Sequence, residues 1–240
     1  ITEFRTAEPT INALTFVSNI AKSLGIELST ETSNFMLGEQ PEQALTRVLE
    51  GDLNQYRASA MTSAPPEVEW LIDRVLLKNR ANLLVAPTGA GKSRLARYLS
   101  AIYSHNMDVD FLGLNVKERG RDTLFLTAED DYNDCWRGMH KLDPQRVRSN
   151  SDGDILFFSY LTNDRVPYFW VQDTITKIMP TSELKNFETE LSLSPNIGLV
   201  IIDNLFNFCG FEMSSNHVAV EYVSGYFDKI AKRYGVTILC

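Results

Sequence analysis

A glycine-rich segment, Ala86-Pro-Thr-Gly-Ala-Gly-Lys-Ser93, constrains the fold of this chain more than any other feature. It follows a short apolar run at residues 83–85 and leads into residues 92–105, whose apolar side chains recur at helical spacing. Glycines in this order allow a backbone whose N–H groups turn toward one bound anion, at a helix N-terminus whose dipole favours negative charge. The segment therefore predicts a phosphate-binding loop between a strand and a helix.

Each position of this loop has a chemical role. The general pattern is GxxxxGK[ST], with Ala86 in place of the first glycine. We expect nucleotide phosphates to contact the whole segment, which comprises Ala86, Pro87, Thr88, Gly89, Ala90, Gly91, Lys92, Ser93 and Arg94. Lys92 is suited to reach the β- and γ-phosphates and to stabilise the transferred phosphoryl group, and the Ser93 hydroxyl to ligate Mg²⁺. The loop thus predicts ATP and Mg²⁺ as cofactors.

An aspartate follows the apolar run at residues 199–202. At the carboxyl end of a central strand, Asp203 is placed to hold the water shell of Mg²⁺ opposite the loop serine. An aspartate that only caps the loop after the strand is the alternative.

A glutamate follows the strand candidate at residues 123–127. Glu129 is our candidate for the base that polarises a water for attack on the γ-phosphate, with Asp130 as its substitute. A solvated acidic turn that caps the next helix is the alternative. A glutamate placed for water favours hydrolysis over the transfer of phosphate to a metabolite by a small-molecule kinase.

Short apolar runs alternate with amphipathic stretches through most of the chain. The expected strands are residues 83–85, 123–127, 155–158, 199–202 and 236–240, and the expected helices are residues 92–105, 134–141 and 217–234. This alternation predicts an α/β fold with a mainly parallel central sheet and helices on both faces. Residues 161–196 do not fit the alternation and receive no assignment, although the aromatic cluster Tyr168-Phe-Trp170 predicts buried packing.

Residues 1–62 differ from the rest and hold no chemical motif. Apolar spacing predicts helices over residues 9–24 and 41–56, so we expect a helical N-terminal extension or linker, with a docking or nucleic-acid-binding module as the alternative. The consecutive prolines Pro65 and Pro66 mark a boundary, and residues 63–240 form the expected main domain. Because the chain stops inside an apolar run at Cys240, we expect this domain to be C-terminally truncated.

The charge balance limits the possible partners. Lys and Arg number 23 against 31 Asp and Glu, for a net charge of −8, which counts against a module that coats duplex DNA with a basic face. The short basic clusters at residues 117–121 and 146–148 are either phosphate contacts or solvated loops. No apolar run approaches the roughly 18 residues of a membrane span, and the three cysteines form no CxxC pair, so we expect a cytoplasmic protein with reduced thiols and no membrane partner.

Three motifs together resemble a RecA-like P-loop ATPase core: the loop Ala86–Ser93, Glu129 in Thr-Ala-Glu-Asp, and Asp203 in Val-Ile-Ile-Asp-Asn-Leu. The phrases Ala-Glu-Asp-Asp131 and Ile-Ile-Asp-Asn-Leu205, with the lead-in from Pro65 to Ile72, are most similar to the plasmid RepA-type hexameric replicative helicases. The resemblance implies a homo-oligomeric ring, a hexamer, that hydrolyses ATP and moves along single-stranded DNA in replication or recombination. It also implies an arginine from the neighbouring subunit and a sensor residue, both around or beyond the fifth strand.

The loop after Asp203, residues 204–216, matches the position at which such relatives contact DNA. Phe206, Phe208 and Phe211 are candidates to stack on bases, with aromatic packing as the alternative. Asn216 is a candidate nucleotide sensor or, alternatively, a helix N-cap. Because the loop contains no Lys or Arg, a signalling or scaffold ATPase that assembles with nucleotide, without translocation, stays open as a second function.

Overall fold

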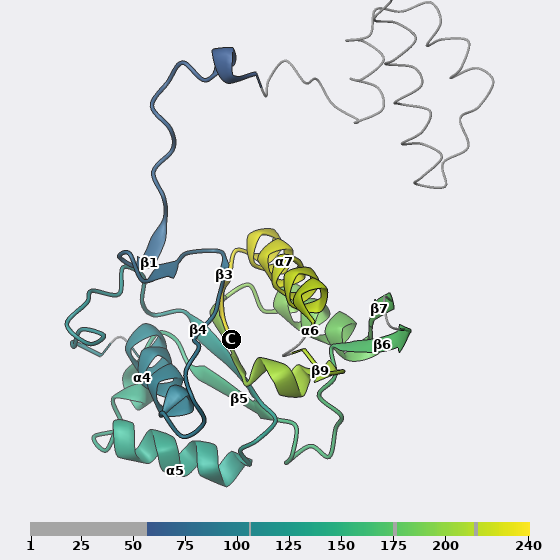
Figure 1. The fold of residues 1–240 in the computed structure, drawn as a ribbon. Coiled ribbons are helices and arrows are strands. Elements are labelled where there is room, and N and C mark those ends of the chain that lie inside the picture. Colours follow the sequence, from purple (N-terminus) through teal and green to yellow (C-terminus); the bar gives the residue numbers. More distant parts are fainter. Residues whose placement is uncertain (1–56, 106, 175–176, 214–215) are drawn as a thin grey trace, which may run out of the picture. The chain divides into compact units, whose positions relative to one another are not determined.

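The computed structural model describes residues 57–240 except 106, 175–176 and 214–215 (Figure 1). The chain divides into two units, Ile1–Glu67 and Val68–Cys240. Of the first unit, the described part contains the short 3-10 helix η2 (Ala58–Ala60). The helices expected over residues 9–24 and 41–56 lie outside the described residues, and the boundary expected between residues 62 and 63 remains a prediction.

The second unit is built on a five-stranded sheet. Its strands are β3 (Ala81–Asn82), β4 (Asp122–Thr127), β5 (Ile155–Ser159), β8 (Ile197–Asp203) and β10 (Thr237–Leu239). They lie in the order β3-β10-β8-β4-β5, and every neighbouring pair is parallel. This arrangement confirms the expected α/β fold with a mainly parallel central sheet.

Helices cover both faces of the sheet, as expected (Figure 1). One face packs against α4 (Lys92–Ser104) and α5 (Tyr132–Leu142), and the other against α6 (Ser182–Leu193) and α7 (His217–Tyr234). Successive residues of β8 alternate between these two cores, since Leu199 and Ile201 join the first and Val200 and Ile202 the second. The continuous apolar runs in the sequence therefore reflect a sheet that is buried on both sides.

The sequence predicted the first strand of the main sheet at residues 83–85, but in the structure this strand lies just before them, at Ala81–Asn82. β3 ends at Asn82, so the apolar run at residues 83–85 is mostly loop, although the Leu84 amide still donates to the Cys240 carbonyl oxygen at 2.8 Å. The side chain of Asn82 accepts from the Leu77 amide at 3.0 Å. Leu83 and Val85 are 53% and 86% exposed, because they border a cavity beside the phosphate-binding loop instead of a neighbouring strand.

The region without a sequence assignment folds into a second, small sheet and a helix. β6 (Trp170–Thr174) pairs antiparallel with β7 (Lys177–Pro180) and parallel with β9 (Cys209–Gly210). Phe169 and Trp170 are fully buried, which confirms the expected aromatic packing for these two residues, whereas Tyr168 is 42% exposed and does not fit it. The pairing of β6 with β9 also fixes the end of the loop that leaves β8.

A hairpin of β1 (Trp70–Ile72) and β2 (Leu76–Leu77) precedes β3. Leu71 and Ile72 are fully buried in the same core as α4, so the lead-in to the main sheet belongs to the domain. Among the described helices, none has the length and apolar content that crossing a bilayer requires.

Candidate nucleotide site

The phosphate-binding loop takes the backbone that its sequence predicts. Gly89 and Gly91 have φ angles of 77° and 89°, in the left-handed region that strains residues with a side chain, and Gly91 is the N-cap of α4. The Lys92 ammonium donates to the carbonyl oxygens of Ala86 at 2.9 Å and Pro87 at 3.2 Å. The Lys92 side chain thus lies over its own loop, and an incoming phosphate can replace the two carbonyl oxygens as its hydrogen-bond partner.

The rest of the loop is open to solvent. Pro87 to Gly91 are exposed, as is Arg94 on the first turn of α4. Within this loop the Ala90 amide donates to the Pro87 carbonyl oxygen at 3.2 Å, and α4 supports the loop at its end.

Asp203 ends β8 directly beside the loop helix, where the Ser93 hydroxyl is close enough to act on the pKa of its carboxyl. Burial raises the pKa of the Asp203 carboxyl, and the negative charges of Glu129 and Asp130 add to this effect, against the hydrogen bond from Ser93 and the charge of Arg97. The site therefore concentrates negative charge next to a serine hydroxyl. Ser93 and Asp203, the two residues that the sequence predicted as Mg²⁺ ligands, therefore lie close together.

Glu129 lies two residues after the end of β4, in a turn where the Thr127 hydroxyl accepts from the amides of Glu129 at 3.3 Å and Asp130 at 3.1 Å. One oxygen of its carboxylate, Oε1, accepts hydrogen bonds from the side-chain amides of Asn204 at 2.5 Å and Asn207 at 3.1 Å. Neutral amides orient this carboxylate without neutralising it.

Asp130, the substitute candidate, has a different environment. Its carboxylate forms an ion pair with Arg97 of α4, whose side chain is 12% exposed. The Arg97 guanidinium also lies over the Phe125 ring, 5.8 Å from its centroid. An aspartate neutralised by a largely buried arginine is suited to join α4 to the end of β4, so the geometry favours Glu129 over Asp130 as the base.

Sequence reasoning missed Arg97, Asn204 and Asn207. Arg97 lies one helical turn after Ser93, so it faces the same side of α4 as the loop serine. Asn204 directly follows Asp203, a polar residue at the carboxyl end of a buried strand. Those two signals were present in the sequence, whereas the approach of Asn207 to Glu129 depends on the fold of η4 (Leu205–Phe208).

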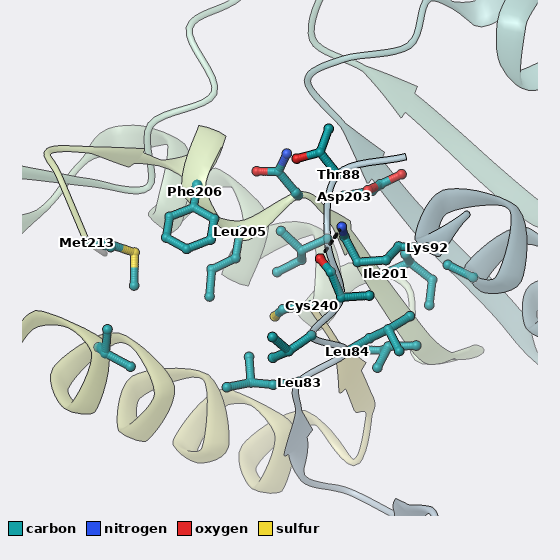
Figure 2. Close-up of a pocket in the computed structure, with 17 residues that line it drawn as sticks. Leu83, Leu84, Thr88, Lys92, Ile201, Asp203, Leu205, Phe206, Met213 and Cys240 are labelled. Atoms are coloured by element: carbon teal, nitrogen blue, oxygen red, sulfur yellow. Dashed lines mark hydrogen bonds between the residues drawn. The ribbon is translucent and has the colours of Figure 1, made fainter. Parts of the chain in front are cut away.

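A cavity of about 410 Å³ opens between the phosphate-binding loop and the segment after β8 (Figure 2). Figure 2 shows Thr88, Lys92 and Asp203 at one end of it. Leu205, Phe206 and Met213 lie toward the other end. The cavity therefore joins an apolar half to the charged groups of the loop, the combination typical of small-molecule sites.

The loop after Asp203 only partly matches its prediction. Phe208 is fully buried, with its ring 5.3 Å from that of Tyr160 and 5.0 Å from that of Phe169, and Phe211 packs against the same core. The stacking role is therefore wrong for Phe208, because the small sheet draws this ring into the core. Phe206 is 59% exposed and remains available.

Asn216 acts as a helix cap. Its side-chain oxygen accepts from the Ala219 amide at 3.1 Å, at the start of α7. This confirms the N-cap alternative for that residue.

The fold and the geometry of this site define a nucleotide-binding P-loop ATPase domain. A family model described as an AAA domain matches residues 49–240, most of the chain. The chain belongs to this AAA domain family. The search of curated proteins found no match.

Proposed function

We propose that this protein hydrolyses ATP with Mg²⁺ and couples hydrolysis to movement along, or unwinding of, nucleic acid as a homo-oligomeric ring, such as a hexamer. The observation that carries the ATPase chemistry is the meeting of Lys92, Ser93, Asp203 and Glu129 at the carboxyl ends of neighbouring parallel strands.

In this proposal the phosphates bind in the loop from Ala86 to Arg94. Lys92 exchanges its hydrogen bonds with the Ala86 and Pro87 carbonyl oxygens for the β- and γ-phosphates. There it stabilises the charge that develops on the transferred phosphoryl group.

Ser93 and Asp203 would hold Mg²⁺. Among the described residues, no three His, Cys, Asp or Glu side chains gather into a metal cage. Mg²⁺ does not need one, because it is usually bound by one or two protein groups together with phosphates and water. When bound, the ion neutralises phosphate charge; the protein's own part is the buried carboxylate with its raised pKa and the adjacent hydroxyl.

Glu129 orients and deprotonates the attacking water. Asn204 and Asn207 hold its carboxylate in one orientation, and both belong to the segment that leads from β8 into residues 204–216. If a change at the γ-phosphate moves Glu129, the two hydrogen bonds therefore transmit this movement to the segment.

That connection supports the coupling to nucleic acid. The amides that contact Glu129 flank Phe206, the exposed aromatic residue of the segment, and an exposed aromatic ring is a stacking surface for a base. The similarity to the RepA-type helicases at residues 65–72, 128–131 and 201–205 supports the same function.

One observation favours a second candidate, a nucleotide-dependent assembly switch that does not translocate. Residues 204–216 contain no Lys or Arg, Phe208 is buried in the domain, and Phe211 is partly buried against the same core. Such a segment is also suited to contact another protein subunit.

The test is ATP hydrolysis with and without single-stranded DNA, beside Lys92→Ala and Glu129→Gln. We expect Glu129→Gln to bind ATP normally and to lose about 100-fold or more in kcat, since general-base catalysis contributes roughly 10²–10⁴. Lys92→Ala should lose turnover and, unlike Glu129→Gln, should bind ATP more weakly as well. Full turnover by Glu129→Gln would exclude it as the base.

The DNA dependence separates the two candidates. Stimulation of the wild-type rate by DNA supports the motor. An unstimulated rate, with assembly that depends on ATP and ignores DNA, supports the switch.

A further inference from the structure

A second cavity, of about 580 Å³, lies on the C-terminal half of α5 and the turn that follows it. That turn contains the 3-10 helix η3 (Val147–Asn150). The residues that border this α5 pocket are one tryptophan, one histidine, one serine and four cations: Trp136, His140, Ser149, Arg137, Lys141, Arg146 and Arg148. None of the residues that line it is acidic.

Two of the four cations are already compensated. Arg137 pairs with Asp134 at 2.5 Å, and Arg148 pairs with the buried Asp143 at 2.7 Å. Arg148 thus fixes the turn to the end of α5.

The other two cations, Lys141 and Arg146, are exposed and form no ion pair within the part of the chain that the structure describes. These two positive charges lie on a chain whose net charge is −8. A concave surface with unpaired positive charge attracts anions locally even on an acidic protein.

Helix capping explains only part of this cluster. His140 and Lys141 lie in the last turn of α5, where cations complement the helix dipole. Arg146 lies outside the helix, in the left-handed conformation with φ 57°, and its amide donates to the Asp143 carbonyl oxygen at 3.2 Å. The backbone therefore holds Arg146 at the pocket independently of any helix-end effect.

Trp136 gives the pocket an apolar surface. Its side chain is 61% exposed, although tryptophan is normally largely buried. His140, four positions after Trp136, lies on the same side of α5, and Lys141 borders the same pocket. An exposed aromatic ring beside unpaired cations is the combination that binds single-stranded nucleic acid, where bases stack on rings and cations follow the backbone.

We propose that the α5 pocket binds single-stranded nucleic acid, with one base stacked on Trp136 and the adjacent phosphates on Lys141 and Arg146. The proposal deepens the proposed function and rests on nucleic acid being its substrate. It supplies the cationic contact that residues 204–216 lack. An acidic peptide would pair with the cations but leave the tryptophan ring uncovered, so the ring favours nucleic acid.

The test measures binding of a fluorescently labelled oligothymidylate to the full chain by anisotropy over a series of salt concentrations. The test variant is Lys141→Ala/Arg146→Ala. The matched control is Lys185→Ala/Lys229→Ala, which removes the same charge from exposed positions on α6 and α7. Thermal unfolding of each variant checks that the fold is retained.

We expect the test variant to bind more weakly and the control to match the wild type. The slope of log K against log salt should become shallower by about 1.4 in the test variant, because each phosphate contact to a single strand contributes about 0.7. Trp136→Ala should weaken binding about tenfold, and Trp136→Phe should recover part of the loss, since a smaller ring still stacks.

Failure of this proposal and failure of the proposed function give different results. Wild-type affinity and salt slope in the test variant overturn the α5 pocket as a nucleic-acid site while leaving a nucleic-acid motor in place. No binding by the wild type, with ATP hydrolysis intact, overturns both the pocket and the coupling to nucleic acid. A change of oligomeric state in the test variant, with oligothymidylate binding unaltered, overturns the proposal in favour of an interface with an acidic surface of a second copy.

Discussion

At the scale of single residues, two adjacent carboxylates after β4 have different partners and therefore different uses. Asp130 is paired with Arg97, whereas the Glu129 carboxylate accepts two neutral amides. A charged carboxylate without a cationic partner remains able to take a proton from water, while a paired one mainly connects elements. These contacts are the reason that we propose Glu129, and not Asp130, as the base.

The two amides lead to a prediction about Glu129. Asn207→Ala removes the donor at 3.1 Å and leaves the donor from Asn204 in place. We expect kcat for ATP hydrolysis to fall about tenfold with little change in KM, because a loosely oriented base acts on the transition state and not on ATP binding. Steady-state kinetics measure this.

Asn186→Ala, at an exposed position on α6, is the matched control. An unchanged kcat in Asn207→Ala would show that this amide does not position Glu129.

At the scale of elements, the small sheet β7-β6-β9 determines how the segment after β8 leaves the site. The Phe169 amide donates to the Phe208 carbonyl oxygen at 2.8 Å, and β9 pairs with β6 immediately afterwards. Phe208 is consequently buried while Phe206, two residues earlier, points into solvent. The segment after β8 is therefore anchored to the core by the Phe208 ring, whereas its Phe206 ring is exposed.

This difference predicts opposite effects of two similar substitutions. Phe208→Ala should lower the free energy of unfolding by about 3–5 kcal/mol, the usual loss for a buried phenylalanine. Phe206→Ala should change it by about 0.5 kcal/mol or less, as for most surface substitutions, yet reduce any stimulation of ATP hydrolysis by DNA. Urea unfolding and ATPase rates distinguish the two.

Equal destabilisation by both substitutions would mean that Phe206 is packed in solution. Undiminished stimulation in Phe206→Ala would separate that ring from the nucleic-acid contact.

At the scale of the whole molecule, parallel pairing brings distant parts of the sequence to one edge of the sheet. Thr127 of β4 is in register with Asp203 of β8, although 76 positions separate Thr127 from Asp203. The site that results holds several acids near a buried carboxylate. Without a bound cation, the domain therefore carries an electrostatic cost that Mg²⁺ would relieve.

That cost makes stability depend on pH through Asp203. Burial raises its pKa in the folded state, so its stabilising contribution is fully present below the unfolded pKa and is lost as pH rises through the folded pKa. Asp203→Asn should therefore raise Tm of the nucleotide-free protein at pH 7, with the difference from wild type shrinking as pH is lowered. The same variant should lose most of the Tm increase caused by Mg²⁺ and ATP.

Asp228→Asn is the control with the opposite sign. Burial alone would raise the pKa of Asp228, but the hydrogen bonds from Lys232 and Arg80 outweigh it and the net pKa is lowered. Asp228→Asn should lower Tm at pH 7. Identical Tm values for Asp203→Asn and wild type at every pH would show that the buried Asp203 carboxylate does not destabilise the nucleotide-free protein.

Local features of the sequence were enough to predict most of the fold and the phosphate loop. The order of glycines around Lys92 specifies a backbone that few other sequences adopt, and continuous apolar runs specify strands buried on both faces. Asp203 and Glu129 were predicted as site residues for the same reason, since acids that follow apolar strands reach the same edge of a parallel sheet. Such patterns act over a few neighbouring residues and are visible without the fold.

Tertiary structure alone decided the features that join segments far apart in the chain. The pairing of β6 with β9, the burial of Phe208 and the amides on Glu129 each depend on long-range contacts with no periodic signal. The sequence by itself determined a nucleotide-binding α/β domain, because backbone geometry and strand burial are local constraints. Which carboxylate lacks a cationic partner, which phenylalanine is exposed and where positive charge collects were set only when packing determined the neighbours of each side chain.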